Sequence, residues 1–208
     1  MNIGTRKIVV DEAIAQLRLY AETNGAVLQY YDGLPGMTAV GGSDPNQVTF
    51  DDLARTMVIG ADLRAMDIPW LIEVEAEKEF AAIPVEARLE DARPGSDLFE
   101  AAMALDDKFT GHRGFGHAKK SKLLHLKRPY LYPVTDSFIR MTYGTTTAGR
   151  DFLAAVHNDL VNPANVRDFK LLQARLIAEP PTSAARLLAE VPTLRLLDIL
   201  ASLLGEAK

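Results

Sequence analysis

The residues with the clearest chemical potential lie between positions 119 and 140, in the stretch KKSKLLHLKRPYLYPVTDSFIR. Five lysine and arginine side chains precede two prolines, and a single carboxylate, Asp136, follows at the expected start of a helix. Cationic side chains bind phosphates, and a carboxylate can stabilise a developing cation or orient a water molecule, as in glycoside cleavage. The stretch therefore predicts a site that combines anion binding with a catalytic carboxylate, Asp136.

Charge is distributed unevenly along the chain. The net charge is -5, but residues 108–128 contain five lysines, two arginines, three of the four histidines and no acidic residue. This segment is therefore +7, while the remainder carries 16 basic against 28 acidic side chains. An acidic body with one basic patch is typical of a protein that meets a polyanion on one face. The alternative is a solvated helix face whose cations pair with acidic residues elsewhere in the fold.

A short glycine motif, Gly114-Phe115-Gly116, precedes the basic run and an expected helix. Glycines let the backbone turn sharply, and free amides at a helix start can bind a phosphate. The alternative is a tight turn without a ligand. The predicted nucleic-acid-binding residues belong to this motif and to the basic run around it: Arg113, Gly114, Gly116, Lys119, Lys120, Lys122, Lys127 and Arg128.

Asp136 and the tyrosines before it have functional and structural interpretations. An aspartate at a helix start commonly caps the helix, and capping would also hold a catalytic carboxylate still. Tyr130 and Tyr132 can stack on a nucleic-acid base, because every base has a flat face. The same two tyrosines can instead form part of the core or of a cleft wall.

Other classes of site receive little support. The chain has no cysteine, which excludes disulfides, thiolate zinc sites, iron–sulfur clusters and cysteine nucleophiles. His112, His117 and His125 do not share one helical face and have no acidic residue among them, so we predict no metal site and no cofactor. No apolar run approaches the roughly 18 residues of a membrane span, and none fits a signal peptide. We expect a cytoplasmic protein that does not bind membranes.

Helical signals dominate the elements that must position these residues. We expect helices over 11–23, 49–65, 69–82, 97–108, 119–127, 136–143, 147–160, 164–178, 182–189 and 194–204. Glycines and prolines predict a long loop over 30–48 and breaks between the later helices. The predicted fold is all-α: one compact domain over residues 1–208, with eight to ten short helices and room for a division into two lobes.

These motifs carry two resemblances. The run SKLLHLKRPYLYPVTDS, with TFDDLARTMVIGADL before it and TLRLLDIL after it, resembles an uncharacterised bacterial family centred on S-K-L-L-x-x-K-R-P-x-L-x-P-V-x-D-S. Gly114-Phe115-Gly116, with Asp136 twenty residues after the second glycine, resembles the helix-hairpin-helix DNA glycosylase superfamily. That resemblance implies a hairpin element over about 105–143 whose amides grip a DNA phosphate. It also implies a flipped nucleotide in a cleft between helical lobes, with Asp136 assisting cleavage of the bond between base and sugar.

The chain departs from the superfamily pattern at three places. His112-Arg113 replaces the usual Leu-Pro, Ala118 occupies the position of the Schiff-base lysine of bifunctional members, and Lys120 stands where a small residue lets the hairpin helices approach. The resemblance therefore implies a monofunctional enzyme that cleaves an N-glycosidic bond with water. The alternative is a noncatalytic module that binds nucleic acid or an acidic partner through residues 108–128.

Overall fold

Helices make up nearly all of the regular structure in the computed structural model, which describes residues 1–32, 44–147 and 149–207. A two-stranded antiparallel hairpin, β1 (Asn2–Ile3) and β2 (Arg6–Lys7), is the only sheet in these ranges. The helices are α1 (Val10–Thr23), the π-helix η1 (Val27–Tyr31), α2 (Phe50–Val58), α3 (Asp67–Glu73), α4 (Glu77–Ala81), the 3-10 helix η2 (Leu89–Asp91), α5 (Asp97–Lys108), α6 (His117–Lys127), α7 (Ser137–Tyr143), α8 (Arg150–Val161), α9 (Pro163–Ile177), α10 (Ala184–Leu187) and α11 (Thr193–Glu206). The prediction of a compact, all-α domain is confirmed.

Some predicted boundaries differ from the structure. The helix expected over 49–65 ends at Val58, because Gly60 adopts a left-handed conformation with φ of 74°. The helix expected over 69–82 is two helices, α3 and α4, separated where Val74 becomes extended. Of the loop expected over 30–48, residues 33–43 lie outside the described ranges.

Side-chain caps fix where several helices begin. The hydroxyl of Thr49 accepts a hydrogen bond from the amide of Asp52, and the Asp52 carboxylate accepts one from the amide of Thr49, which forms a capping box at α2. Ser96 caps α5, and Asn162 caps α9 ahead of Pro163. Each cap satisfies amides that the first turn of a helix leaves free.

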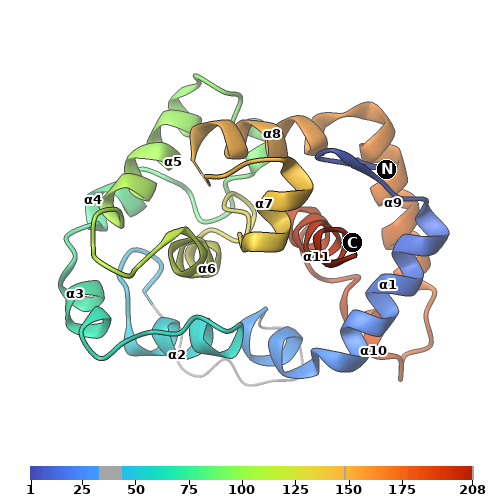
Figure 1. Cartoon of the computed structure of the whole chain (residues 1–208), viewed down its shortest axis with the longest axis horizontal. Helices are drawn as coiled ribbons and strands as arrows, with labels where there is room; N and C mark the ends of the chain where they lie inside the picture. The colour runs from blue at the N-terminus through green and yellow to red at the C-terminus, as the bar shows by residue number, and fades with distance from the viewer. Residues whose placement is uncertain (33–43, 148, 208) are drawn as a thin grey trace.

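Three helices, α6, α7 and α11, lie at the centre of the fold, and the other helices surround them (Figure 1). Helix α11 is buried around most of its circumference, as expected for a helix whose residues are apolar on nearly all sides. Helix α6 is different, because its buried residues include Lys120, His125 and Lys127. Part of the basic segment, around Lys120 and from His125 to Arg128, therefore lies in the interior of the protein.

The packing of α7 against α11 depends on a glycine. A Cβ atom at Gly205 would lie 2.2 Å from the carbonyl oxygen of Phe138 on α7. We expect Gly205→Ala to lower the free energy of unfolding by about 1–3 kcal/mol, because the α7 backbone must move to admit the methyl group. Urea unfolding measures the change. The control is Gly25→Ala, where an added Cβ meets no atom within 4 Å; equal stability of the two variants would contradict the close approach.

Candidate functional site

Two lysines of the predicted nucleic-acid surface, Lys120 and Lys127, are buried and pair with carboxylates from other elements. The ammonium group of Lys120 lies 2.5 Å from the carboxylate of Asp106, and only 4% of the lysine side chain is exposed. Lys127 pairs with Asp52 at 2.5 Å, with both side chains 1% exposed. Because a phosphate cannot reach either ammonium group, the expectation that Lys120 and Lys127 bind nucleic acid is corrected. The alternative interpretation of the basic segment was a solvated helix face whose cations pair with acidic residues elsewhere in the fold. The pairing is present for Lys120 and Lys127, but both pairs are buried.

Arg128 follows α6 and is also buried. Its guanidinium donates hydrogen bonds to the carbonyl oxygens of Ile83 at 2.8 Å, Pro45 at 2.8 Å and Phe80. The side chain therefore ties the end of α6 to the segment after α4 and to the chain before α2. Because the guanidinium is buried and donates its hydrogen bonds to oxygens of the protein, Arg128 does not belong to the predicted nucleic-acid surface.

The two tyrosines predicted to stack on a base have other contacts. Tyr132 is buried, and its hydroxyl donates to the carbonyl oxygen of Ala102 at 2.6 Å. Tyr130 is half-buried beneath Arg88, whose guanidinium carbon lies 4.9 Å from the centre of the ring. These contacts fit the alternative interpretation, in which both tyrosines are structural.

The loop over 109–116 connects α5 to α6 and carries the glycine motif. Gly114 has φ of 85°, a conformation that favours glycine, and Gly116 is the residue directly before α6. Arg113, Gly114 and Gly116 are all exposed. Helix α6 points along the view in Figure 1, whereas α5 lies across it, and Lys120 reaches from one to Asp106 on the other. A bulky residue at position 120 thus bridges the two helices.

One buried carboxylate anchors this loop. Asp67 accepts hydrogen bonds from the guanidinium of Arg64 at 2.6 Å and from the ammonium of Lys119 at 3.3 Å, and it lies 3.2 Å from the ring of His112. The Arg64 guanidinium is the main cause that holds the pKa of Asp67 well below its usual value. Lys119 therefore contributes to loop anchoring and remains only partly accessible.

The Asp67 anchor predicts a pH-dependent contribution to stability. An aspartate whose pKa is lowered by folding stabilises the folded state fully above the unfolded-state pKa of about 3.9, and that stabilisation is lost progressively as pH falls from there through the lower folded-state pKa. We expect Asp67→Asn to lower the free energy of unfolding at pH 7 by about 1.5–3 kcal/mol. Urea unfolding at pH 7 and at pH 3 should show the difference from wild type shrinking in acid. A constant difference would contradict the ionic role, and Asp151→Asn, at an exposed residue of α8, is the control.

A cleft of about 520 Å³, called here the central cleft, is lined by residues of α1, α6, α7 and α11. Aliphatic side chains form much of its wall, and its polar residues include Tyr20, Lys122, Asp136, Arg195, Asp198 and Ser202. A mostly apolar cavity of this volume, with a few convergent polar groups, is typical of a small-molecule site. Two of the predicted site residues, Lys122 and Asp136, lie together in it.

Asp136 both caps a helix and lines the central cleft. Its Oδ1 atom accepts a hydrogen bond from the amide of Ile139 at 2.7 Å, which is the capping bond of α7. Its Oδ2 atom accepts one from the hydroxyl of Ser202 on α11 at 3.0 Å. The two bonds fix the orientation of the carboxylate, while the side chain stays partly exposed in the cleft wall.

A second aspartate in the cleft wall has a different environment. Asp198 is fully buried; its Oδ2 accepts from the amide of Val134 at 2.8 Å, and its Oδ1 has no hydrogen-bond partner among the described residues. Burial raises the pKa of Asp198 well above its usual value, although the charge of Arg195 opposes the shift. The cleft wall thus contains two aspartates in different environments: Asp136 is partly exposed and held by two hydrogen bonds, whereas Asp198 is buried with one oxygen unpartnered among the described residues.

The contribution of α11 to this cleft was not predicted from the sequence. Arg195 is buried and pairs with Asp32 at 2.8 Å, and it also lies 3.3 Å from the hydroxyl of Tyr20. Arg195 and Asp198 are three residues apart within the apolar segment TLRLLDIL. Charged residues on one face of an otherwise buried helix need polar partners. The spacing of Arg195 and Asp198 could therefore have predicted that this face of the C-terminal helix meets a polar site.

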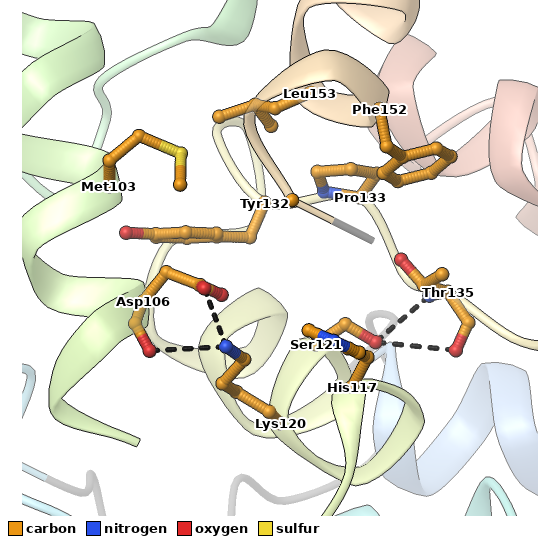
Figure 2. Close-up of a pocket in the computed structure, with 11 residues that line it drawn as sticks. Met103, Asp106, His117, Lys120, Ser121, Tyr132, Pro133, Thr135, Phe152 and Leu153 are labelled. Atoms are coloured by element: carbon orange, nitrogen blue, oxygen red, sulfur yellow. Dashed lines mark hydrogen bonds and ion pairs between the residues drawn. The ribbon is translucent and has the colours of Figure 1, made fainter. Parts of the chain in front are cut away.

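A smaller pocket is lined by residues of α5, α6, α8 and the segment 132–135 (Figure 2). Tyr132 and Thr135 line it, next to the Lys120–Asp106 pair, and the Nδ1 atom of His117 is buried there without a partner among the described residues. Its volume of about 30 Å³ holds one or two water molecules but no larger ligand. Two other hollows, of about 620 Å³ and 600 Å³, are lined by none of the predicted site residues, so the central cleft, which holds Lys122 and Asp136, is the candidate ligand site.

The chain belongs to a family of unknown function (DUF6308), whose model matches residues 13–205. Searches of curated proteins and of solved structures found no match. Across the described ranges, no helix is both long and apolar enough to cross a membrane, and no group of three or more histidine or acidic residues could hold a metal ion. Membership of an uncharacterised family is thus confirmed. Because the family supplies no activity, function must be argued from the central cleft.

Proposed function

We propose that the protein hydrolyses an N-glycosidic bond, with a nucleotide in the central cleft and Asp136 as the catalytic carboxylate. The observation that carries this proposal is the position of Asp136, which lines a cleft of about 520 Å³ while hydrogen bonds from Ile139 and Ser202 hold both of its oxygens. A carboxylate fixed in advance of the reaction stabilises developing positive charge without reorganisation. The glycosylase resemblance assigns the same role to this residue.

The proposed reaction adds water across the bond between sugar and base. The bond from C1′ to the base nitrogen breaks, and its electron pair leaves with the base. Positive charge develops on C1′ and the ring oxygen, where the carboxylate of Asp136 stabilises it. A water molecule then adds to C1′, and the proton that it loses neutralises the departing base.

The proposed contact with DNA is limited to the exposed part of the basic segment. Arg113, Gly114 and Gly116 are exposed at the start of α6, and Lys119 is partly exposed beside them. The first amides of a helix bind phosphate through hydrogen bonds and the helix dipole. In this proposal the loop holds the DNA backbone while the nucleotide occupies the cleft.

The second candidate is a noncatalytic module that binds nucleic acid or an acidic partner with the same loop. The observation that favours it is the exposed cation of Arg113 beside the start of α6. In that case Arg113→Ala lowers both the affinity for a polyanion and the salt dependence of binding. Asp136→Asn leaves the affinity unchanged.

Release of free base tests the proposed function directly. The full chain is incubated with single-stranded and duplex oligonucleotides that carry alkylated, oxidised or deaminated bases, and free base and abasic sites are measured. We expect release from at least one substrate. Binding without release from any of them would reject hydrolysis and favour the noncatalytic module.

A further inference from the structure

The central cleft contains a cation, Lys122, that has no partner among the described residues. Lys122 on α6 is half-buried and lines the cleft, and within the described residues its ammonium group makes no hydrogen bond or ion pair. Burial lowers the pKa of Lys122, and the charge of Asp136 opposes that shift. A partly desolvated, unpaired ammonium costs free energy that an anionic ligand would recover.

Arg195, the other cation that lines the cleft, and the carboxylate of Asp136 are engaged by the protein itself, whereas Glu206 and the Oδ1 atom of Asp198 have no hydrogen-bond partner among the described residues. Both oxygens of Asp136 accept hydrogen bonds, one from Ile139 and one from Ser202. The guanidinium of Arg195 pairs with Asp32 at 2.8 Å. An anion that enters the cleft would therefore meet Lys122 as the cation still free to donate.

We propose that Lys122 binds a phosphate group of the ligand, so that the central cleft takes a nucleotide in preference to a nucleoside. The proposal rests on the proposed function, because it names the substrate class of the site that contains Asp136. An ammonium group offers three donors, and phosphate oxygens accept short, charge-assisted hydrogen bonds from it. Lys122 thereby differs from Lys119 and Lys120, whose ammonium groups lie 3.3 Å and 2.5 Å from carboxylates of the protein.

Binding measurements with matched ligands test this assignment. Deoxynucleoside 5′-monophosphates of the four DNA bases are compared by calorimetry with the corresponding deoxynucleosides. For at least one base we expect the wild-type protein to bind the monophosphate about 10-fold to 100-fold more tightly, the range for one hydrogen-bonded charge pair. Equal affinity for all four pairs would overturn the proposal without any variant.

Variants assign the preference to one side chain. Lys122→Gln is expected to bind the monophosphate and the nucleoside with affinities within about twofold of each other, whereas Lys122→Arg keeps the preference because it keeps the charge. Lys170→Gln is the matched control, since Lys170 is exposed on α9 and is not among the residues that line the cleft. An unchanged preference in Lys122→Gln would reject Lys122 as the phosphate contact.

A third ligand shows whether the phosphate belongs to a nucleic-acid strand or to a free nucleotide. A trinucleotide without terminal phosphates presents only the diester groups of a nucleic-acid strand. Lys122-dependent binding of this trinucleotide identifies the strand as the source, and Lys122-dependent binding of monophosphates alone identifies a free nucleotide. Phosphate preference without any base release would reject the proposed hydrolysis but leave the role of Lys122 standing, and base release without phosphate preference would do the reverse.

Discussion

Replacing Asp136 by asparagine is expected to lower the rate of base release by about 10²-fold to 10³-fold, the usual loss when one preorganised electrostatic group is removed. The substitution removes the negative charge that stabilises the developing cation. It keeps a side-chain oxygen that can accept the capping bond from Ile139, and asparagine is as good a cap as aspartate. We therefore expect stability to change by less than about 1 kcal/mol. Single-turnover base release and thermal unfolding measure the two quantities.

Two further variants control for the position of the charge. Asp151→Asn makes the same chemical change at an exposed residue of α8 and should leave base release unchanged. Ser202→Ala removes the hydrogen bond to Asp136 Oδ2 while keeping the carboxylate, so we expect a smaller loss of rate than in Asp136→Asn. Full activity of Asp136→Asn would reject the assigned mechanism. Full activity together with a lower thermal stability would show that Asp136 acts only as a helix cap.

Local signals in the sequence predicted the helices because the interactions that start and end them are local. Thr49 and Ser96 cap helices through amides only three residues away. The same kind of signal placed Asp136 at the start of α7. The equally local signal at Gly60, whose left-handed backbone ends α2, was missed, because the helix was expected to continue to residue 65. Where the signal failed, as over 69–82, a change of backbone direction at Val74 had no distinctive residue pattern.

The burial of the basic run could not be predicted, because it depends on partners that are distant in the sequence. Lys127 is neutralised by Asp52, and Lys120 by Asp106. Lysine is rarely buried unless it is paired, and the spacing of residues within a helix gives no information about a carboxylate on another element. The sequence could therefore locate the positive charge but not decide which lysines face solvent.

The cleft was incompletely predicted for the same reason. Asp136 and Lys122 belong to the segment that the sequence singled out, but Ser202, Arg195 and Asp198 come from α11. Only the packing of α11 against α7 brings the hydroxyl of Ser202 within 3.0 Å of Asp136. Asp136, the single carboxylate of the stretch 119–140, therefore belongs to a cluster of polar residues in the folded chain.

The buried pair between Lys120 and Asp106 predicts a large loss of stability when the lysine is replaced. Lys120→Met leaves the carboxylate of Asp106 largely buried without its cation and removes the hydrogen bond to Thr110. Breaking a buried pair in this way costs about 3–5 kcal/mol, because the remaining charge is uncompensated. Burial already raises the pKa of Asp106, and the hydrogen bond from Lys120 opposes that rise. Urea unfolding of the variant gives the measurement.

Two comparisons show whether Lys120 stabilises the fold or binds phosphate. The double variant Lys120→Met with Asp106→Leu should recover part of the lost stability, since an apolar pair can replace a buried ionic one at little cost. Arg150→Met breaks the exposed pair with Glu100, whose side chains are 52% and 50% exposed, and should cost at most about 1 kcal/mol. A surface lysine that binds DNA would give the opposite pattern, with weaker DNA binding and almost unchanged stability in Lys120→Met. That result would contradict the interior position of the basic run.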